Sequence, residues 1–249
     1  MSGGVIVLLV LVTIIGPLIG GTNAEVSHPA DANSAPSAEH WLGTDNLGRD
    51  VLLRVIWGAR ISLAVGVIAV AIGLISGVLL GLLAGWRGGL TDLLIMRGID
   101  ALLAFPGLLL AIASTAALGP NLRNAMIAIG IVAIPVYTRP ARGQVLQLRE
   151  REYIEAARAL GARDGRIIFR HLLPNILNPL IVQASLSIAF AILAAASLSF
   201  LGLGVQPPTP TWGSDINQAR LPHQWLLVDE LRARHGDPDH RARVQLPRR

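Results

Sequence analysis

The chain has 249 residues, of which 52% are hydrophobic and 15% are charged, and its formal net charge is +5. A soluble domain carries about 25% charged residues, so this deficit indicates a membrane protein. The absence of cysteine excludes disulfides and thiolate chemistry, and all 21 basic residues are Arg, which excludes lysine-dependent chemistry. These Arg residues cluster beside apolar runs, so the positive charge does not indicate nucleic-acid binding.

The first apolar run, residues 5–19, begins a series of five segments that are candidates to cross a bilayer. A span needs roughly 20 apolar residues in a helix. No basic residue precedes this run, so we interpret it as an uncleaved span, with a signal peptide as the alternative. A polar extramembrane loop, residues 22–50, follows it. Residues 51–61 are then expected to form an amphipathic helix at the membrane interface.

The second span, residues 61–86, contains no charged residue. Its glycines recur at steps of four or seven, which places small residues on one helix face where a second helix can approach closely. The alternative is the ordinary tolerance of membrane helices for glycine. The glycines are Gly66, Gly73, Gly77, Gly81 and Gly85.

The third span, residues 99–118, follows a short polar connection at 87–97. Arg97 and Asp100 are three residues apart, so one helix face can pair them near the end of the span. Pro106 lies inside the span and is expected to kink it, because proline removes a backbone donor.

The fourth span, residues 125–138, and the fifth, residues 176–201, enclose a polar segment at 139–170. This segment and residues 87–97 lie on the same side of the membrane and hold ten Arg residues. The positive-inside rule therefore places 139–170 in the cytoplasm and residues 22–61 outside.

Residues 144–160 carry apolar side chains in a helical stripe, with charged residues around it. On this helix Glu155 can pair with Arg151 and Arg158. Gly161 is expected to end the helix, as a C-terminal glycine does.

A second short helix is expected between Asp164, which can cap it, and Pro174, which ends it. The two helices form a hairpin that protrudes into the cytoplasm. Its tip, residues 159–164, carries small side chains and suits insertion into a groove on another protein. A solvated loop without a partner is the alternative.

The hairpin resembles the EAA loop of bacterial ABC importer permeases. Glu155-Ala156-Ala157 is followed after three residues by Gly161 and later by Leu173-Pro174. His171 stands where the general pattern has an aliphatic residue, which is similar to the dipeptide/oligopeptide/nickel branch. The loop motif at 43–50 and the segment from Phe200 to Gly213 strengthen this resemblance, which covers about residues 41–220. The residues that it assigns to coupling with an ATPase are Glu155, Ala156, Ala157, Gly161, Ala162, Asp164, His171, Leu173 and Pro174.

The resemblance implies an all-α, polytopic transmembrane helical bundle in the bacterial inner membrane. It implies the permease subunit of an ATP-driven importer of peptides or nickel complexes, without cofactor or enzymatic activity of its own. The implied partners are a sister permease, two cytoplasmic ATPase subunits and an extracytoplasmic solute-binding protein. Two alternatives stay open: a non-functional permease fragment, and a stand-alone secondary transporter, which is expected to carry intramembrane charges and inverted repeats.

The C-terminal segment, residues 221–249, departs from the family pattern. Members of the family have a sixth span after the loop at Trp212 and Gly213, whereas this segment is dense in Arg and Asp. Each charge at a bilayer centre costs about 2.5–3.5 kcal/mol, so the segment is not expected to cross a membrane. A reading-frame shift near Leu221 is the favoured explanation and a true five-span variant the alternative. The expected organisation is thus residues 1–60, a transmembrane core at 61–220 with the coupling loop at 139–175, and a polar tail at 221–249.

Overall fold

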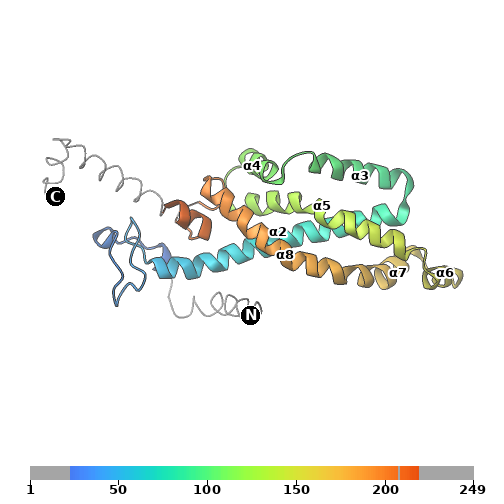
Figure 1. The fold of residues 1–249 in the computed structure, drawn as a ribbon, viewed down its shortest axis with the longest axis horizontal. Coiled ribbons are helices and arrows are strands. Elements are labelled where there is room, and N and C mark those ends of the chain that lie inside the picture. Colours follow the sequence, from blue (N-terminus) through green and yellow to red (C-terminus); the bar gives the residue numbers. More distant parts are fainter. Residues whose placement is uncertain (1–22, 207, 219–249) are drawn as a thin grey trace. The chain divides into compact units, whose positions relative to one another are not determined.

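The computed structural model describes residues 23–206 and 208–218 (Figure 1). Helices dominate these residues, and their only β-type pairing is an isolated bridge between Thr44 and Asp50. The predicted all-α class is therefore confirmed. The first predicted span, residues 5–19, and the polar tail at 221–249 lie outside the described residues.

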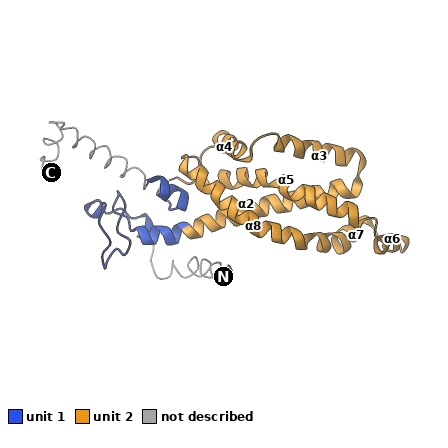
Figure 2. Ribbon diagram, viewed as in Figure 1, with its two compact units in different colours: residues 1–58, 208–249 blue, residues 59–207 orange. Residues whose placement is uncertain are grey.

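The described chain divides into two compact units, which Figure 2 shows in different colours. One unit comprises residues 23–58 and 208–218 of the described chain, with the short helices η1 (Asn23–Glu25) and η2 (Pro29–Asp31). The other unit, residues 59–207, holds most of the helical bundle. The helices of the bundle are α2 (Val51–Arg87), α3 (Gly89–Leu103), α4 (Gly107–Leu118), α5 (Leu122–Leu148), α6 (Glu152–Ala159), α7 (Asp164–Ile167), the π-helical turn η3 (Ile168–Leu172) and α8 (Leu173–Phe200).

Within the described residues, three helices are long and apolar enough to cross a membrane: α2, α5 and the continuous helix Asp164–Phe200. The pair α3 and α4 passes the same test together, although the two are bent by 91° at their junction. The predicted spans at 61–86, 99–118 and 125–138 each fall within one of these elements, and the span at 176–201 does so up to Phe200, where the helix ends. The described residues therefore confirm a polytopic membrane bundle.

The predicted helix boundaries were wrong in three places. No separate interfacial helix forms at 51–61, because α2 runs without a break from Val51 to Arg87. The predicted polar connection at 87–97 is helical, since Gly88 is the one residue that separates the end of α2 from the start of α3. The fourth span extends to Leu148, because polar and arginine-rich sequence can continue a helix beyond the apolar segment.

Pro106 breaks the third span rather than kinking it. Helix α3 ends at Leu103, and Pro106 has an extended ψ of 126° before α4 begins at Gly107. Proline disfavours the helical conformation of the residue before it and cannot donate to the preceding turn. The two effects together end one helix and start the next.

The glycine face of α2 packs directly on α5. A Cβ atom added to Gly77 would lie 2.7 Å from the Ile134 carbonyl oxygen, and one added to Gly81 would lie 2.6 Å from Ala141 Cβ. Gly73 and Gly85 face α5 at similar distances, whereas Gly66 faces α8. Real Cβ atoms essentially never approach other atoms this closely, so glycine is what allows the two backbones to meet.

Helix α5 occupies the centre of the 59–207 unit, since it contacts α3, α4 and α8 in addition to α2. Its inward residues Tyr137, Ala141 and Val145 are fully buried. Two residues of α8, Ile176 and Leu198, belong to the same hydrophobic core. The segment that follows the C-terminal end of α5 is therefore connected directly to the packed centre of the bundle.

Candidate functional site: the hairpin between α5 and α8

The hairpin that the sequence predicts is residues 149–172, between the end of α5 and the start of α8 (Figure 1). The helix expected at 144–160 is in fact two helices, because the chain turns at 149–151. Arg149 still has helical dihedral angles, but Arg151 is extended, with φ −83° and ψ 141°. This turn sets α6 apart from α5, and Figure 1 shows α6 beyond the end of α5.

Gly161 ends α6 as expected. Its φ of +78° lies in the left-handed region that favours glycine. The Gly161 amide donates to the Arg158 carbonyl at 2.9 Å, and the Ala162 amide donates to the Ala157 carbonyl at 3.0 Å. This pair of bonds is a Schellman motif, which satisfies the last carbonyls of the helix. The motif leaves the side chain of Leu160 88% exposed at the tip of the hairpin.

The second half of the hairpin differs from the prediction. Asp164 does not cap a helix with its side chain: Arg163 is the N-cap residue and Asp164 is the first residue of α7. Pro174 does not end the helix either, because α7, η3 and α8 follow one another without a break. A π-helical turn is found mostly as a single-turn irregularity within α-helices, and here it ends at Leu172, two residues before the proline. Pro174 is the second residue of α8 and lies within the continuous helix Asp164–Phe200, which passes it after the π-helical turn.

One face of the hairpin is anchored in the core. Ile154 of α6, Ile167 of α7 and Leu172 of η3 are all 0% exposed and belong to the hydrophobic core. The residues that the family resemblance assigns to coupling lie around this anchor. Glu155, Ala156, Gly161, Asp164 and Pro174 are exposed, whereas Ala157, Ala162, His171 and Leu173 are half-buried.

The two ion pairs expected for Glu155 do not form among the described residues. The Arg158 guanidinium instead lies over the Trp86 ring, 4.7 Å from its centroid. Glu155 is therefore exposed on the hairpin without a partner within the described chain, and its carboxylate is accessible to solvent.

Three arginine contacts that the sequence did not predict join the hairpin and the end of α5 to the end of α2 and the start of α3. Arg142 donates two hydrogen bonds to the Asp92 carboxylate, at 2.5 and 2.6 Å. Arg149 donates to the Gly85 carbonyl at 3.1 Å. Arg158 makes the contact with Trp86 already described. No sequence pattern marks these contacts, because Arg142 and Asp92 are 50 residues apart.

Asp100 pairs with Arg139 of α5, not with Arg97 as expected. The Arg139 Nη2 atom lies 2.8 Å from Asp100 Oδ1, and both side chains are about half exposed. Arg97 is an exposed residue on α3. The contact between α3 and α5 brings Arg139 to Asp100, and a spacing of three along one helix cannot reveal a partner on another helix.

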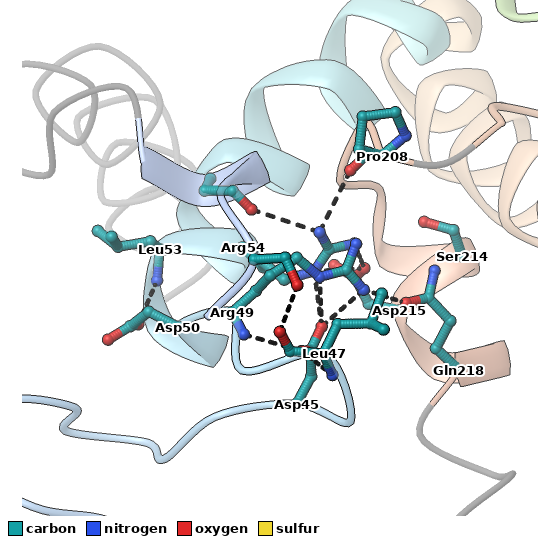
Figure 3. Close-up of polar contacts among 12 residues, drawn as sticks. Asp45, Leu47, Arg49, Asp50, Leu53, Arg54, Pro208, Ser214, Asp215 and Gln218 are labelled. Atoms are coloured by element: carbon teal, nitrogen blue, oxygen red, sulfur yellow. Dashed lines mark hydrogen bonds and ion pairs between the residues drawn. The ribbon is translucent and has the colours of Figure 1, made fainter. Parts of the chain in front are cut away.

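The loop motif at 43–50 builds a second polar cluster, shown in Figure 3. Gly43 and Gly48 both have φ of +73°, and a Cβ atom on Gly48 would lie 1.8 Å from the His28 carbonyl oxygen. Between them, Asp45 accepts hydrogen bonds from the amides of Leu47 and Arg49 at 2.8 and 2.9 Å. The motif is thus a tight turn that is stabilised by hydrogen bonds to its own aspartate, Asp45.

Two buried arginines fasten this turn to the segment after α8 (Figure 3). Arg49 and Arg54 are only 2% and 3% exposed. Arg49 pairs with Asp45 at 2.6 Å and donates to Gln218 at 2.5 Å. Arg54 pairs with Asp215 and reaches Asp45 at 3.8 Å. Two cations and two carboxylates balance, as buried charges require.

The two carboxylates of this cluster respond oppositely to their surroundings. Burial alone would raise the pKa of Asp45, but the hydrogen bonds from Arg49 and from the backbone amides lower it overall. Burial raises the pKa of Asp215 despite its contact with Arg54. The charged side chains of the cluster pair with one another and join the turn at 43–50 to Asp215 and Gln218, so the cluster has a structural role.

Comparison with known proteins places the chain among importer permeases. Residues 77–228 match the family described as "Binding-protein-dependent transport system inner membrane component". The chain is 50% identical to the dipeptide transport system permease protein DppC of Alkalihalophilus pseudofirmus over 216 residues, covering 87% of this chain and 71% of that protein.

The chain is likewise 50% identical to glutathione transport system permease proteins GsiD. For the protein of Pectobacterium atrosepticum the match covers 76% of this chain and 62% of the relative. For that of Escherichia coli O6:K15:H31 it covers 86% and 71%.

Among solved structures, the fold is similar to chains of the MetNI methionine ABC transporter in inward-facing conformations. In the native crystal form, the TM-score is 0.54 at 21% identity, with 77% of this chain and 96% of that chain covered. A second crystal form gives a TM-score of 0.51 at 23% identity, covering 77% and 95%. The fold, the family match and the curated relatives agree. The chain therefore belongs to the family of inner membrane components of binding-protein-dependent transport systems, and it is a multi-span protein of the inner membrane.

Proposed function

We propose that the chain is a channel-forming subunit of an ATP-driven importer for short peptides. The observation that carries this proposal is the 50% identity to a dipeptide permease over 87% of the chain. The glutathione permeases at the same identity support the same substrate class, because glutathione is itself a small peptide. The chemistry of ATP hydrolysis belongs to separate subunits in this proposal.

The hairpin at 149–172 is the proposed docking element for a cytoplasmic ATPase subunit. Its buried face holds it firmly to the bundle, through Ile154, Ile167 and Leu172. Its free face presents the exposed Glu155 carboxylate and the Leu160 side chain at a tip of small residues. An anchored element with an exposed apolar tip and a free charge suits a groove on a partner.

The proposed mechanism converts the energy of ATP binding into a preference between two transmembrane states. Two ATPase subunits close on ATP, and each closed subunit holds a docked hairpin in one position. A ligand shifts an equilibrium only by its differential affinity for the two states, so the hairpin has to differ in position between them. The proposed partners are a sister permease of the same class, two ATPase subunits and an extracytoplasmic binding protein that delivers the peptide.

Reconstituted transport tests this proposal. The chain is purified with its sister permease and ATPase subunits, placed in proteoliposomes, and supplied with the binding protein and a labelled dipeptide. We expect ATP-dependent uptake of the dipeptide, which excess glutathione or an unlabelled dipeptide reduces. Uptake of a nickel complex without peptide uptake would reject the substrate class. Peptide uptake by the chain alone, driven by an ion gradient, would favour a secondary transporter instead.

A further inference from the structure

The end of α2 and the start of α3 form a tight corner at residues 85–92, on the same unit as the hairpin. Gly88 and Gly89 have φ of +64° and +54°, which lets the chain reverse between the two helices within one residue. A positive φ at two consecutive residues is costly for any side chain other than glycine. The corner is therefore a defined turn between two long helices.

The carbonyl end of α2 is held from the hairpin side. Gly85 lies in the last turn of α2, where carbonyl groups lack partners within the helix. The Arg149 guanidinium donates to this carbonyl at 3.1 Å, and its positive charge also complements the negative end of the helix dipole. The same guanidinium would lie 3.9 Å from a Cβ atom on Gly88. Arg149 is the first residue of the hairpin, so the contact spans the two elements directly.

The two flanks of the corner are held as well. On the α2 side, the Arg158 guanidinium lies over the Trp86 ring at 4.7 Å. On the α3 side, the two hydrogen bonds from Arg142 to Asp92 form a bidentate pair whose side chains are 30% and 20% exposed. A bidentate pair fixes the orientation of both groups as well as their distance.

We propose that Arg149 and Arg158 of the hairpin, together with Arg142 of the adjoining helix α5, are positioning residues that link the hairpin and the end of α5 to the corner at 85–92. The proposal rests on the proposed docking function. It adds the contacts through which a movement of the hairpin is transmitted to α2 and α3. Helices α5 and α8 continue into the hairpin through the chain, so they follow its movement directly. Helices α2 and α3 have no such connection, and the three arginines supply it.

The apolar packing of α2 on α5 does not replace this link. The glycine face holds α2 against α5 itself, and the nearest atoms to its glycines belong to α5 rather than to the hairpin at 149–172. The charged contacts at the corner are directional, so they set the register of α2 and α3 relative to the hairpin. Without these contacts, we expect the hairpin to move and the corner at 85–92 not to follow its movement.

The test uses the reconstituted complex and measures peptide transport per ATP hydrolysed. The substitutions are Arg142→Gln, Arg149→Gln and Arg158→Gln, and the matched control is Arg139→Gln. Arg139 also pairs with an aspartate of α3, but it contacts neither the hairpin nor the corner in the described residues. We expect transport per ATP to fall by roughly threefold or more in the three variants and to stay near the wild-type value in the control.

Two further variants separate a positioning role from a simple loss of stability. Arg142→Lys keeps the charge but not the bidentate geometry, so we expect an intermediate ratio with normal amounts of folded protein. The exchange Asp92→Arg with Arg142→Asp restores the pair in reverse, and we expect it to recover most of the lost coupling. Failure of this rescue, with the folded protein present, counts against the proposal.

Capture of the ATPase subunit by each purified variant completes the design. We expect capture to be unchanged, because the exposed tip of the hairpin is not altered. Unchanged capture together with unchanged transport per ATP in all three variants would overturn this inference alone. Absence of capture by the wild-type chain would overturn the proposed docking function and this inference with it.

Discussion

Arg158 of the hairpin lies over the ring of Trp86 at the end of α2, with 4.7 Å between the guanidinium carbon and the ring centroid. A cation over an aromatic face is worth about 0.5–1 kcal/mol at an exposed site and more when it is desolvated. The contact joins two elements that are 72 residues apart in the sequence. It illustrates how the hairpin is held by side chains that no local motif identifies.

Gly161→Ala is expected to loosen the tip of the hairpin. The φ of +78° is strained for any residue with a Cβ atom, although no atom lies within 4 Å of the added carbon. The expected cost is therefore conformational, about 1–2 kcal/mol. Amide hydrogen exchange at 157–163 should become faster in this variant.

Gly165→Ala is the matched control for this substitution. Gly165 also has open space around it, but it lies within α7 with ordinary helical geometry. We expect unchanged or slower exchange there, because alanine favours helix over glycine. Equal effects of the two substitutions would contradict the role assigned to the backbone of Gly161.

Gly81→Ala is expected to destabilise the contact between α2 and α5. The added Cβ atom would meet Ala141 Cβ at 2.6 Å and the Thr138 carbonyl oxygen at 2.7 Å, so one helix has to shift. Overpacking of this kind costs typically 1–3 kcal/mol. A lower midpoint of thermal unfolding in detergent checks this prediction. Gly98→Ala in α3, where nothing lies within 4 Å, should leave the midpoint unchanged or raise it, because alanine favours helix over glycine.

Ile154→Ala is expected to detach α6 from the core while leaving the spans intact. Ile154 is 0% exposed, and removing a buried isoleucine side chain costs about 2–5 kcal/mol. Protease cleavage within 149–163 should therefore increase strongly. Tyr153→Ala, next to it but 43% exposed, should have a much smaller effect. Cleavage that is equally fast in both variants would show that Ile154 does not anchor the helix.

The loop at 28–50 is expected to loosen as the pH rises through the neutral range. The His40 Nδ1 atom lies 2.9 Å from Asp50 Oδ2, and this hydrogen bond raises the pKa of His40 above 6.5, with smaller contributions from the charges of Asp50, Glu39 and Asp31. A raised histidine pKa gives stabilisation that is fully present below about 6.5 and is lost as the pH rises through the raised value. Asp50 also accepts from the Leu53 amide at 2.9 Å, so the start of α2 is linked to the same group.

Hydrogen exchange of the Leu53 amide, corrected for intrinsic rates, measures this dependence. Protection should fall as the pH rises above about 6.5 in the wild-type chain and be independent of pH in His40→Gln. The same pH dependence in the His40→Gln variant would assign the effect to another group.

The sequence predicts the parts of this fold that depend on local pattern. Uncharged runs identify the membrane helices, the spacing of Gly77 and Gly81 identifies the face that meets α5, and Gly161 marks the end of α6. Each of these signals acts within one helix, where hydrophobicity and backbone conformation decide the outcome. The break at Pro106 was predicted only as a kink, because a lone proline does not reveal how far the chain bends.

The contacts between elements could not be predicted from spacing. Asp100 was paired with Arg97 on its own helix, but the packing of α3 on α5 gives it Arg139. The bidentate pair between Asp92 and Arg142 depends on the same packing. Pro174 was expected to end a helix, and only the structure shows a π-helical turn that lets the helix continue past it. Tertiary packing decides the partners of Asp100 and Asp92, and the local π-helical turn decides the outcome at Pro174.

The side of the membrane that the hairpin faces is the most direct test of the account. The chain has no cysteine, so Leu160→Cys at the 88% exposed tip and Trp41→Cys at a 71% exposed position of the loop at 22–50 give single reactive thiols. In spheroplasts, whose inner membrane is intact, a membrane-impermeant maleimide should label the Trp41→Cys variant and not the Leu160→Cys variant. In inverted vesicles the pattern should reverse, and the ATPase subunit should protect Leu160→Cys. Labelling of Leu160→Cys from the outer side of spheroplasts would contradict the account.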